Sequence, residues 1–477
     1  MSTARNIGSS ALFEKIKLVA LAIITIFAAH FTSEVVASVW YVILLIQYAR
    51  SKNEAFWFVF FFITTDGFFG FLGLYSTVIK AIPGLPGIEI AQFYILISLI
   101  KVLKQRQKPR IFFNNWLTLM CVYCIFLFGF GMIIGLTADL SIYFKIIKTL
   151  IPLTLFYTLP RLIYTVEDNE RMFSLLFMVT IFALVAQLMT LFTGFDPKIY
   201  TAKIDASNGD LENKIEVGRN FRVIYNTGIV IISLFGALYM LALRKRHLFS
   251  DGYLYILTMA CFAIAFLSAT RGWIISFSFI IIVSLLVIQK IKGNHLLVLG
   301  LILGVFIVAG MFNKKVNTQI QYSIDRLFTL NSLVEGDQTA GGTLIRLTER
   351  SPRVMKVWRK SPVFGVGFSN DYLEYADGHV ANQNILLHAG IVGFAIMILF
   401  FLSFCLKMAF SFINLPATNP YKKTFPVFII FLIGWYFIHS TSGQQFAYYG
   451  LPAQIFPVAV FLNLGAITYG IRNIPVE

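Results

Sequence analysis

The chain has 477 residues, of which 58% are hydrophobic and only 13% are charged, and its mean hydropathy is +0.77. A soluble domain carries about 25% charged residues, so this composition excludes a water-soluble globular enzyme and a disordered chain. The 39 lysines and arginines outnumber the 23 acidic residues, which leaves a formal charge of +16. A membrane protein places such an excess in its cytoplasmic loops or at a site for an anionic ligand.

Apolar segments of membrane-spanning length follow one another along most of the chain. A spanning helix needs about 20 mostly apolar residues, and this criterion gives about 14 candidates. In chain order the predicted spans are 17–31, 34–49, 55–78, 88–104, 111–136, 141–160, 172–194, 223–243, 253–269, 272–289, 295–312, 381–406, 425–440 and 450–470. The sequence therefore predicts an all-α, polytopic membrane helix bundle, with residues 1–477 as a single membrane domain.

Lysines and arginines divide the breaks between these spans into two kinds. With the N-terminus inside, the even-numbered breaks carry most of the basic residues, and the short odd-numbered breaks hold little beyond Lys80 and Arg271. This positive-inside alternation predicts an even number of spans and both termini in the cytoplasm. Two long breaks, 195–222 and 313–380, then lie on the outer side. We expect the larger one to contain short helices, and long loops are often functional.

Four cysteines lie inside apolar segments, and two of them, Cys121 and Cys124, form a C-x-x-C pair. That spacing is compatible with zinc or redox chemistry. Within an apolar helix it is interpreted instead as two small apolar side chains, without a disulfide framework. The first apolar segment is followed almost at once by the second, with no small-residue cleavage pattern between them, so no cleavable signal peptide is expected.

Three charged residues stand inside predicted spans and away from their ends. A charge at mid-bilayer costs about 2.5–3.5 kcal/mol, so it indicates either pairing or function. Asp66, in the span 55–78, is expected to pair with a basic group of the bundle. Lys145 and Lys148 are three residues apart and share a helix face in the outer half of the span 141–160. They either snorkel or pair with Asp66, or they add positive potential to an outward-facing site.

Arg271 is the most informative single residue. It lies in S-A-T-R-G-W (268–273), at the tight outer turn between two spans, where an isolated arginine opposes the positive-inside pattern. Either it holds lipid headgroups, or it is a fixed guanidinium that takes a phosphate in bidentate fashion. Arg219 and Arg222 form a second outward cluster just before the span 223–243.

A third basic cluster lies in the larger loop, where a helix is predicted over 351–361, capped by Ser351 and with proline at its first position. Arg346, Arg350 and Arg353 are spaced i, i+4, i+7 and share one face if the helix continues through that proline. The stretch is either a solvated basic face on the anionic outer leaflet or, with the other outward clusters, part of a site for one anionic ligand. Its further basic residues are Lys356, Arg359 and Lys360.

His379 lies at the end of the same loop, in Y-A-D-G-H-V-A-N-Q-N (375–384), with Asp377 close by and Asn382 and Asn384 one turn further on. A histidine of near-neutral pKa beside a carboxylate is a natural general base for a hydroxyl group. The alternative is a loop histidine without a role. No histidine pair or dense carboxylate set predicts a metal site. No nucleotide-binding loop is found, so an ATP-driven pump is not expected.

Three outward motifs together resemble the O-antigen polymerase and ligase superfamily of bacterial inner-membrane glycosyltransferases. They are S-A-T-R-G-W (268–273), R-L-T-E-R-S-P-R-V-M-K-V-W-R-K-S-P-V-F-G-V-G-F (346–368) and D-G-H-V-A-N-Q-N-I-L-L-H-A-G-I-V-G (377–393). The resemblance covers roughly 260–410. It departs from the family pattern where Val380, rather than asparagine, follows the histidine, and where His388 replaces a common acid. The matching positions are Arg271, Arg346, Trp358, Pro362, Gly365, Gly367, His379, Gly390 and Gly393.

The resemblance implies a GT-C-type bundle and a metal-independent, inverting glycosyltransferase without cofactors. The implied donor is a glycan on undecaprenyl diphosphate, and the implied acceptor is a sugar hydroxyl that His379 deprotonates. Arg271 and Arg346 are then catalytic through binding of the diphosphate, where guanidinium groups stabilise the charge of the leaving group. The remaining diphosphate-binding residues are Arg222, Arg350 and Arg219, and supporting roles fall to Asn382, Lys145, Lys148 and Asp377.

The same resemblance implies a bacterial inner-membrane protein whose site faces the periplasm. Its expected partners are the lipid-linked oligosaccharide, membrane lipid, a chain-length regulator and a flippase, and not nucleic acid. A polysaccharide polymerase of the O-antigen or capsule type is favoured over an O-antigen ligase, whose acceptor is lipid A-core. A flippase or transporter for lipid-linked oligosaccharides is the alternative from another class, and it predicts charges that reach both faces through a central cavity. A non-enzymatic assembly subunit needs neither a base nor an arginine set.

Overall fold

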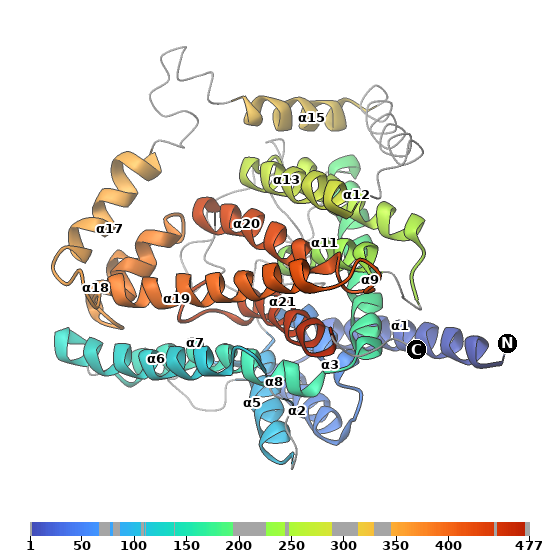
Figure 1. Cartoon of the computed structure of the whole chain (residues 1–477). Coiled ribbons are helices and arrows are strands. Elements are labelled where there is room, and N and C mark those ends of the chain that lie inside the picture. Colours follow the sequence, from blue (N-terminus) through green and yellow to red (C-terminus); the bar gives the residue numbers. More distant parts are fainter. Residues whose placement is uncertain are drawn as a thin grey trace.

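The computed structural model describes residues 2–65, 77–79, 86–105, 109, 111–137, 139–193, 226–243, 248–288, 313–328, 345–442 and 446–472 (Figure 1). Within these ranges the chain is almost wholly helical. The helices of the bundle are α1 (Ser2–Phe31), α2 (Glu34–Arg50), α3 (Glu54–Thr65), α5 (Ile90–Leu103), α6 (Asn114–Gly135), α7 (Leu140–Leu150), η1 (Ile151–Thr154), α8 (Leu155–Leu162), α9 (Val166–Thr193), α11 (Thr227–Ala242), α12 (Asp251–Leu267), α13 (Arg271–Ile288), α19 (Ala381–Asn414), α20 (Thr424–Ser442) and α21 (Pro452–Ile471).

Six helices of the described residues are long and apolar enough to cross a membrane. They are α6, the continuous α7–α8 unit, α9, α13, α19 and α21. Five shorter apolar helices accompany them, namely α3, α5, α11, α12 and α20. The predicted all-α membrane bundle is thereby confirmed, whereas the number of fourteen spans stays a prediction. The predicted span 295–312 lies outside the described residues.

The predicted span 55–78 is wrong at its C-terminal end. Helix α3 is described only as far as Thr65, and Val78–Ile79 forms a strand, β1, instead of a helical turn. This strand pairs antiparallel with β2, Ile88–Glu89, in a ladder of two residue pairs. The sequence between the two strands contains two Pro and two Gly residues, which disfavour a continuing helix. Asp66 lies outside the described residues.

Four short helices lie in the larger predicted loop: α15 (Lys314–Leu327), η3 (Arg346–Arg350), α17 (Ser351–Trp358) and α18 (Asn370–Tyr375). The helix predicted over 351–361 is therefore present as α17. Its predicted cap is wrong, because η3, a turn of π-helix, continues directly into α17 and the Ser351 N–H donates to Arg346 O. Pro352 has no N–H group to continue the π-helical hydrogen bonds, and the chain changes there from the π-helical turn to the α-helix α17.

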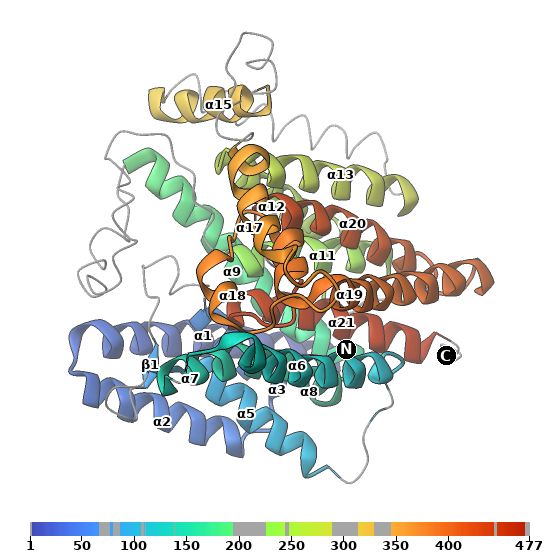
Figure 2. The same ribbon diagram turned by 90° about the vertical axis from the view of Figure 1, so that its left-hand side faces the viewer.

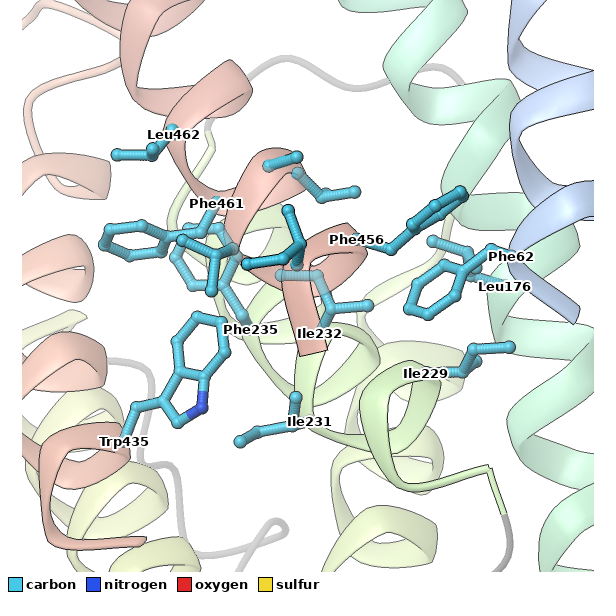
Figure 3. Close-up of a cluster of buried hydrophobic side chains, with 14 of the residues drawn as sticks. Phe62, Leu176, Ile229, Ile231, Ile232, Phe235, Trp435, Phe456, Phe461 and Leu462 are labelled. Atoms are coloured by element: carbon cyan, nitrogen blue, oxygen red, sulfur yellow. The ribbon is translucent and has the colours of Figure 1, made fainter. Parts of the chain in front are cut away.

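The core of the bundle surrounds α11, which is apolar on all sides and buried along Gly228–Ala242. Figure 3 shows Phe235 of this helix close to Phe461 of α21, with Trp435 of α20 beside them. The ring centroids of Phe235 and Phe461 are 5.1 Å apart, which is a favourable aromatic separation. Because lipid removes the hydrophobic drive between helices, close packing of this kind is what holds the bundle together.

Contacts between distant segments gather several predicted inner breaks at one end of the bundle, here called the basic end. Tyr164, Tyr421 and Ile471 line one cavity of about 290 Å³ and so bring three of these segments together. The N and C labels of Figure 1 both lie toward this end. The hydrogen bonds that join the segments are Lys101 Nζ to Ser51 O (2.8 Å), Gln105 Nε2 to Arg161 O (3.4 Å), Asn419 Nδ2 to Arg472 O (2.9 Å) and Lys423 Nζ to Ile288 O (2.8 Å).

The antiparallel packing of α13 against α20 places Arg271 at the end of the bundle opposite to the basic end. Lys423, just before α20, contacts the last residue of α13, so the two helices start at opposite ends. Further along, Gly434 of α20 packs against Ser276 and Ile280 of α13, as an antiparallel pair requires. The first residue of α13, Arg271, therefore lies beside the end of α20, far from the basic end.

The opposite end also carries His379, and we call it the His379 end. Asn382 Nδ2 donates to Ser440 Oγ at 3.2 Å, which brings the start of α19 to the end of α20. Thr137 Oγ1 donates to Asn370 Oδ1 at 2.9 Å, which brings the segment after α6 to the start of α18. In Figure 1 this end is on the left, where α17 and α18 lie. The described breaks named here thus lie at opposite ends of the bundle according to their kind.

Candidate functional site at the His379 end

Arg271 opens α13 directly after a short turn. In that turn Ala269 has a φ of 50°, a left-handed conformation that costs a non-glycine residue about 1–2 kcal/mol. The Thr270 N–H donates to the Ser268 hydroxyl at 3.3 Å and closes the turn. Strained backbone of this kind is concentrated at functional sites. The turn places Arg271, which is partly exposed, at the His379 end.

Asp377 is the centre of a polar cluster at this end. Its side chain is 9% exposed and accepts hydrogen bonds from Arg350 Nη1 at 3.3 Å and from Arg353 Nη2 at 3.1 Å. The backbone N–H of His379 donates to the same carboxylate at 3.0 Å. One acid therefore holds two guanidinium groups on one helix face, as their spacing predicts, and fixes the backbone of the histidine next to them.

The electrostatics of His379 come from that arrangement. Partial desolvation of the imidazole, followed by the guanidinium groups of Arg350 and Arg346, lowers the pKa of His379 below its usual value. The carboxylate of Asp377 opposes this shift without cancelling it. The side chain is exposed, so a ligand at the surface can reach it. At neutral pH the imidazole is therefore neutral and able to accept a proton.

Two asparagines hold the loop that carries His379. Asn384, buried in the first turn of α19, accepts from the Asp377 N–H at 2.9 Å, and its Nδ2 donates to the Asp377 carbonyl. Asn382 accepts from the Tyr436 hydroxyl at 2.8 Å and donates to Ser440 of α20. Sequence analysis named Asn382 as the support, but the residue that fastens the Asp377 turn is Asn384.

Two glycine pairs, Gly365 with Gly367 and Gly390 with Gly393, lie close together in space. Helix α19 is interrupted at Gly390, where φ is 63° and ψ is −171°. The loop that follows α17 fills the gap: Val366 N–H donates to Leu387 O at 2.7 Å, and Gly367 N–H donates to His388 O at 2.9 Å. The broken helix thus recovers partners for two carbonyl groups that lost their own turn.

The same loop also accepts hydrogen bonds from the N–H groups that follow the break in α19. Ile391 N–H donates to Pro362 O at 3.0 Å, and Val392 N–H donates to Val363 O at 3.1 Å. A Cβ atom on Gly390 would lie 2.3 Å from the Val363 carbonyl oxygen, so only glycine fits. These glycines therefore build the scaffold that holds the larger loop on α19, and they do not themselves carry chemistry.

His388 is buried beside this junction and does not belong to the polar cluster. Its ring is 4.3 Å from that of Phe368, 4.8 Å from Tyr372 and 5.0 Å from Tyr449, measured between centroids. With 1% of its surface exposed, it has no path to a substrate hydroxyl. His388 is thus a packing residue among aromatic rings.

A non-helical segment, 446–450, enters the bundle between α20 and α21, which sequence analysis did not foresee. Tyr448 OH donates to Gly393 O at 2.6 Å, and Gly450 N–H donates to Thr149 O at 3.0 Å. Non-helical backbone is tolerated at membrane depth only where protein buries it or where it lines a cavity. The only signal in the sequence is the run of aromatic and small residues before the proline that starts α21.

The other predicted site residues fall into two groups. Lys148 Nζ donates to Gly87 O at 2.6 Å and so holds the residue that precedes β2. Lys145 is exposed on α7. Arg219 and Arg222 lie outside the described residues. Within the part of the chain that the structure describes, no group of three His, Cys, Asp or Glu residues has the geometry to hold a metal ion.

No family model matches the chain, and no curated protein matches it in a sequence search. Its chemistry has therefore to be argued from the cluster itself. Cations held by an acid, beside a neutral imidazole, suit a reaction in which an anionic group leaves as a hydroxyl loses its proton.

Proposed function

We propose that the protein is a polysaccharide polymerase: a metal-independent, inverting glycosyltransferase that moves a glycan from undecaprenyl diphosphate to a hydroxyl of a second lipid-linked repeat unit. The observation that carries the proposal is the cluster in which Arg350 and Arg353 converge on Asp377 and the electrostatic influence of Arg346 reaches His379. Arg271 lies at the same end of the bundle. Such a cluster can bind a pyrophosphate ester through its guanidinium groups and accept a proton from an alcohol through its imidazole.

In the proposed reaction the acceptor oxygen attacks the anomeric carbon while the bond from that carbon to the diphosphate oxygen breaks. His379 takes the hydroxyl proton, and the bonding electrons leave with undecaprenyl diphosphate. Arg271 and Arg346 bind this leaving group, whose negative charge grows as the bond breaks, and guanidinium donors of this kind each contribute about 2.7–4 kcal/mol. Asp377 positions Arg350 and the histidine loop.

We further propose fourteen spans, both termini in the cytoplasm and the His379 end in the periplasm of a bacterial inner membrane. The support is the gathering of Arg161, Lys423 and Arg472 at the basic end, because cytoplasmic loops carry the excess of lysine and arginine. The resulting orientation presents the arginine and histidine cluster to the compartment where lipid-linked glycans are assembled.

A flippase remains the alternative from another class. It requires polar or charged groups along a path from one end to the other. The cluster around Asp377 is instead confined to one end, and α11 at the centre is buried and apolar. The distribution of charge among the described residues therefore favours chemistry at one face over passage through the bundle.

The direct test uses purified full-length protein in proteoliposomes. The substrate is the single-repeat oligosaccharide on undecaprenyl diphosphate, extracted from a strain that lacks the gene, with EDTA present and no nucleotide sugar. We expect a ladder of longer lipid-linked glycans from the wild-type protein and none from Arg271→Ala or His379→Ala. Arg359→Ala, which removes an exposed cation of the same loop outside the cluster, is the matched control and retains the ladder.

Two results would overturn the proposal. With lipid A-core added as a second acceptor, transfer to it without a ladder identifies a ligase, whereas movement of the substrate across the membrane without any new glycosidic bond identifies a flippase. A wild-type ladder from both the Arg271 and His379 variants also removes the assigned site.

A further inference from the structure

A cavity of about 580 Å³ lies between α5, α6 and the α7–α8 unit. These helices run along the lower side of the bundle in Figure 1. Figure 2 shows these helices side by side from the His379 end. Cys121 and Cys124, the pair singled out by their spacing, both line this cavity, and both are free thiols. The volume is within the range of sites that bury most of a ligand. We call this cavity the α6 groove.

The α6 groove presents an apolar surface even where its lining residues are polar. Five of the polar lining side chains bond inside the protein: Thr118 Oγ1 donates to Asn114 O (3.2 Å), Thr154 Oγ1 to Ile151 O (2.8 Å), Tyr448 OH to Gly393 O (2.6 Å) and Cys124 Sγ to Tyr448 O (3.4 Å), while Asn114 Oδ1 accepts from Arg161 Nη2 (3.1 Å). Because burial of an unpaired polar ligand group is costly, the occupant is a hydrocarbon chain.

The groove occupies the half of the bundle toward the basic end. Helix α6 has 22 residues and is about 33 Å long at 1.5 Å per residue, close to the ~30 Å of a bilayer core. The α6 residues that line the groove run from Asn114, at the basic end, to Ile125, which corresponds to about 16 Å. The groove thus covers one leaflet, the one opposite to the His379 end.

Toward the His379 end the groove reaches the aromatic packing beside the candidate site. Tyr448 lines the groove, and the next residue, Tyr449, lies 5.4 Å from Tyr372 of α18 between ring centroids. On α7 the exposed Lys145 precedes the lining residue Ile147 by two positions, toward the His379 end. A lipid whose charged head is held at that end has its chain directed into this groove.

The opening of the groove at the basic end does not suit the headgroup of a phospholipid from the leaflet on that side. Arg161 is 5% exposed, donates to Tyr157 O at 2.7 Å and stacks on the Tyr157 ring. Its second amino group is the one bonded to Asn114. Arg161, the cation beside the groove at the basic end, is therefore already bonded within the protein. A lipid chain must then enter the groove from the His379 end.

We propose that the α6 groove binds the far half of the polyprenyl tail after it has crossed the bilayer midplane, so that the protein selects long-chain lipid donors. This inference rests on the proposed function, whose donor it specifies by tail length. A two-chain phospholipid of the outer leaflet ends near the midplane and does not reach the groove.

Cys121 provides a direct readout of occupancy, because it is exposed within the groove. The full-length protein in nanodiscs is treated with N-ethylmaleimide, and modification of Cys121 is followed by peptide mass spectrometry, with Cys405 of α19, outside the groove, as internal control. We expect undecaprenyl diphosphate to slow modification of Cys121 at least fivefold and to leave Cys405 unchanged. The same amount of farnesyl diphosphate or dioleoyl phosphatidylglycerol has no effect.

A filled groove provides the second readout. Cys121→Trp adds an indole inside the groove, and Ile133→Trp adds one on the lipid-facing side of the same helix, where Ile133 is 81% exposed. We expect Cys121→Trp to raise KM for the undecaprenyl donor more than tenfold and to leave transfer from a farnesyl-linked donor unchanged. The Ile133→Trp control retains both activities.

Equal protection of Cys121 by phosphatidylglycerol, or absence of protection by undecaprenyl diphosphate, overturns the inference. Failure of glycosyl transfer in the wild-type protein, with Cys121 still protected by the long-chain lipid alone, overturns the proposed enzyme and supports the groove. The two proposals are therefore separable.

Discussion

The two ends of the bundle both carry basic side chains, but they use them differently. At the basic end the cations cap helices: Lys423 donates to the last carbonyl of α13, Arg472 donates to Tyr469 O near the end of α21, and Lys101 donates to the carbonyls that end α2. Cations near helix C-termini satisfy orphan carbonyls and oppose the helix dipole. These side chains are structural.

At the His379 end two arginines of the larger loop converge on one acid, Asp377. Arg350 and Arg353 share a single carboxylate, and Arg346 contributes to the potential at His379. Such a cluster has an excess of positive charge over the one acid that holds it, which a diphosphate can complement. The comparison teaches that the partners of a cation, a helix-end carbonyl or a shared carboxylate, separate the structural cations of the basic end from those proposed to bind a ligand.

The largest effect expected from this comparison is on turnover. His379→Ala removes the proposed general base and is expected to lower kcat by about 10²–10⁴-fold. Lys423→Ala, at the basic end, removes a helix cap and is expected to cost about 0.3–1 kcal/mol of stability without a change in kcat. Initial rates and thermal unfolding of both variants in detergent check the contrast. Equal loss of kcat in the two variants would contradict it.

Arg271 tests whether geometry or charge alone matters at the His379 end. Arg271→Ala is expected to lower kcat by roughly 10²–10³-fold, as removal of one preorganised donor does. Arg271→Lys keeps the charge but loses the planar, two-pronged contact, so we expect it to stay close to the alanine variant. Single-turnover rates of the two variants decide this. Full activity in the lysine variant would show that the side chain acts as a diffuse charge.

The glycine junction gives a prediction on stability. Gly390→Ala forces a left-handed residue with a Cβ 2.3 Å from Val363 O, and we expect a loss of about 3 kcal/mol or more. Gly129→Ala in α6 meets nothing within 4 Å and is expected to be neutral or to gain up to about 1 kcal/mol. Thermal unfolding by intrinsic fluorescence measures the difference. A neutral Gly390→Ala would show that the larger loop is not locked into α19.

The smallest expected effect is on the pH profile. The pKa of His379 is lowered chiefly by desolvation and by Arg350 and Arg346, so its base form is present above a pKa below the usual value, and activity falls as pH drops through it. Arg350→Gln removes a positive neighbour and moves the acidic limb of kcat/KM to higher pH. Asp377→Asn moves it to lower pH. Profiles from pH 4 to 8 check both directions, with Arg359→Gln as the unchanged control.

Part of the site follows from the sequence, because local spacing determines it. The i, i+3 relation of Arg350 and Arg353 places both on one helix face, and the structure shows both on the same carboxylate. The proximity of Asp377 to His379 is likewise a matter of two residues along the chain. The role of the glycine pairs was not predictable, because it depends on a backbone break at Gly390 whose partner is the 362–367 loop. The role of Asn384 depends on how the turn at Asp377 folds back on the first turn of α19.

By itself the sequence determined that the chain is an α-helical membrane protein and which of its breaks are basic, because hydropathy and charge act residue by residue against lipid. Only the tertiary structure decided that Gly390 interrupts α19, that the 362–367 loop fills the gap, and that the 446–450 segment enters the bundle. Such contacts join segments that are adjacent in space and distant along the chain. No periodicity records them, since they are selected by the packing of the finished bundle.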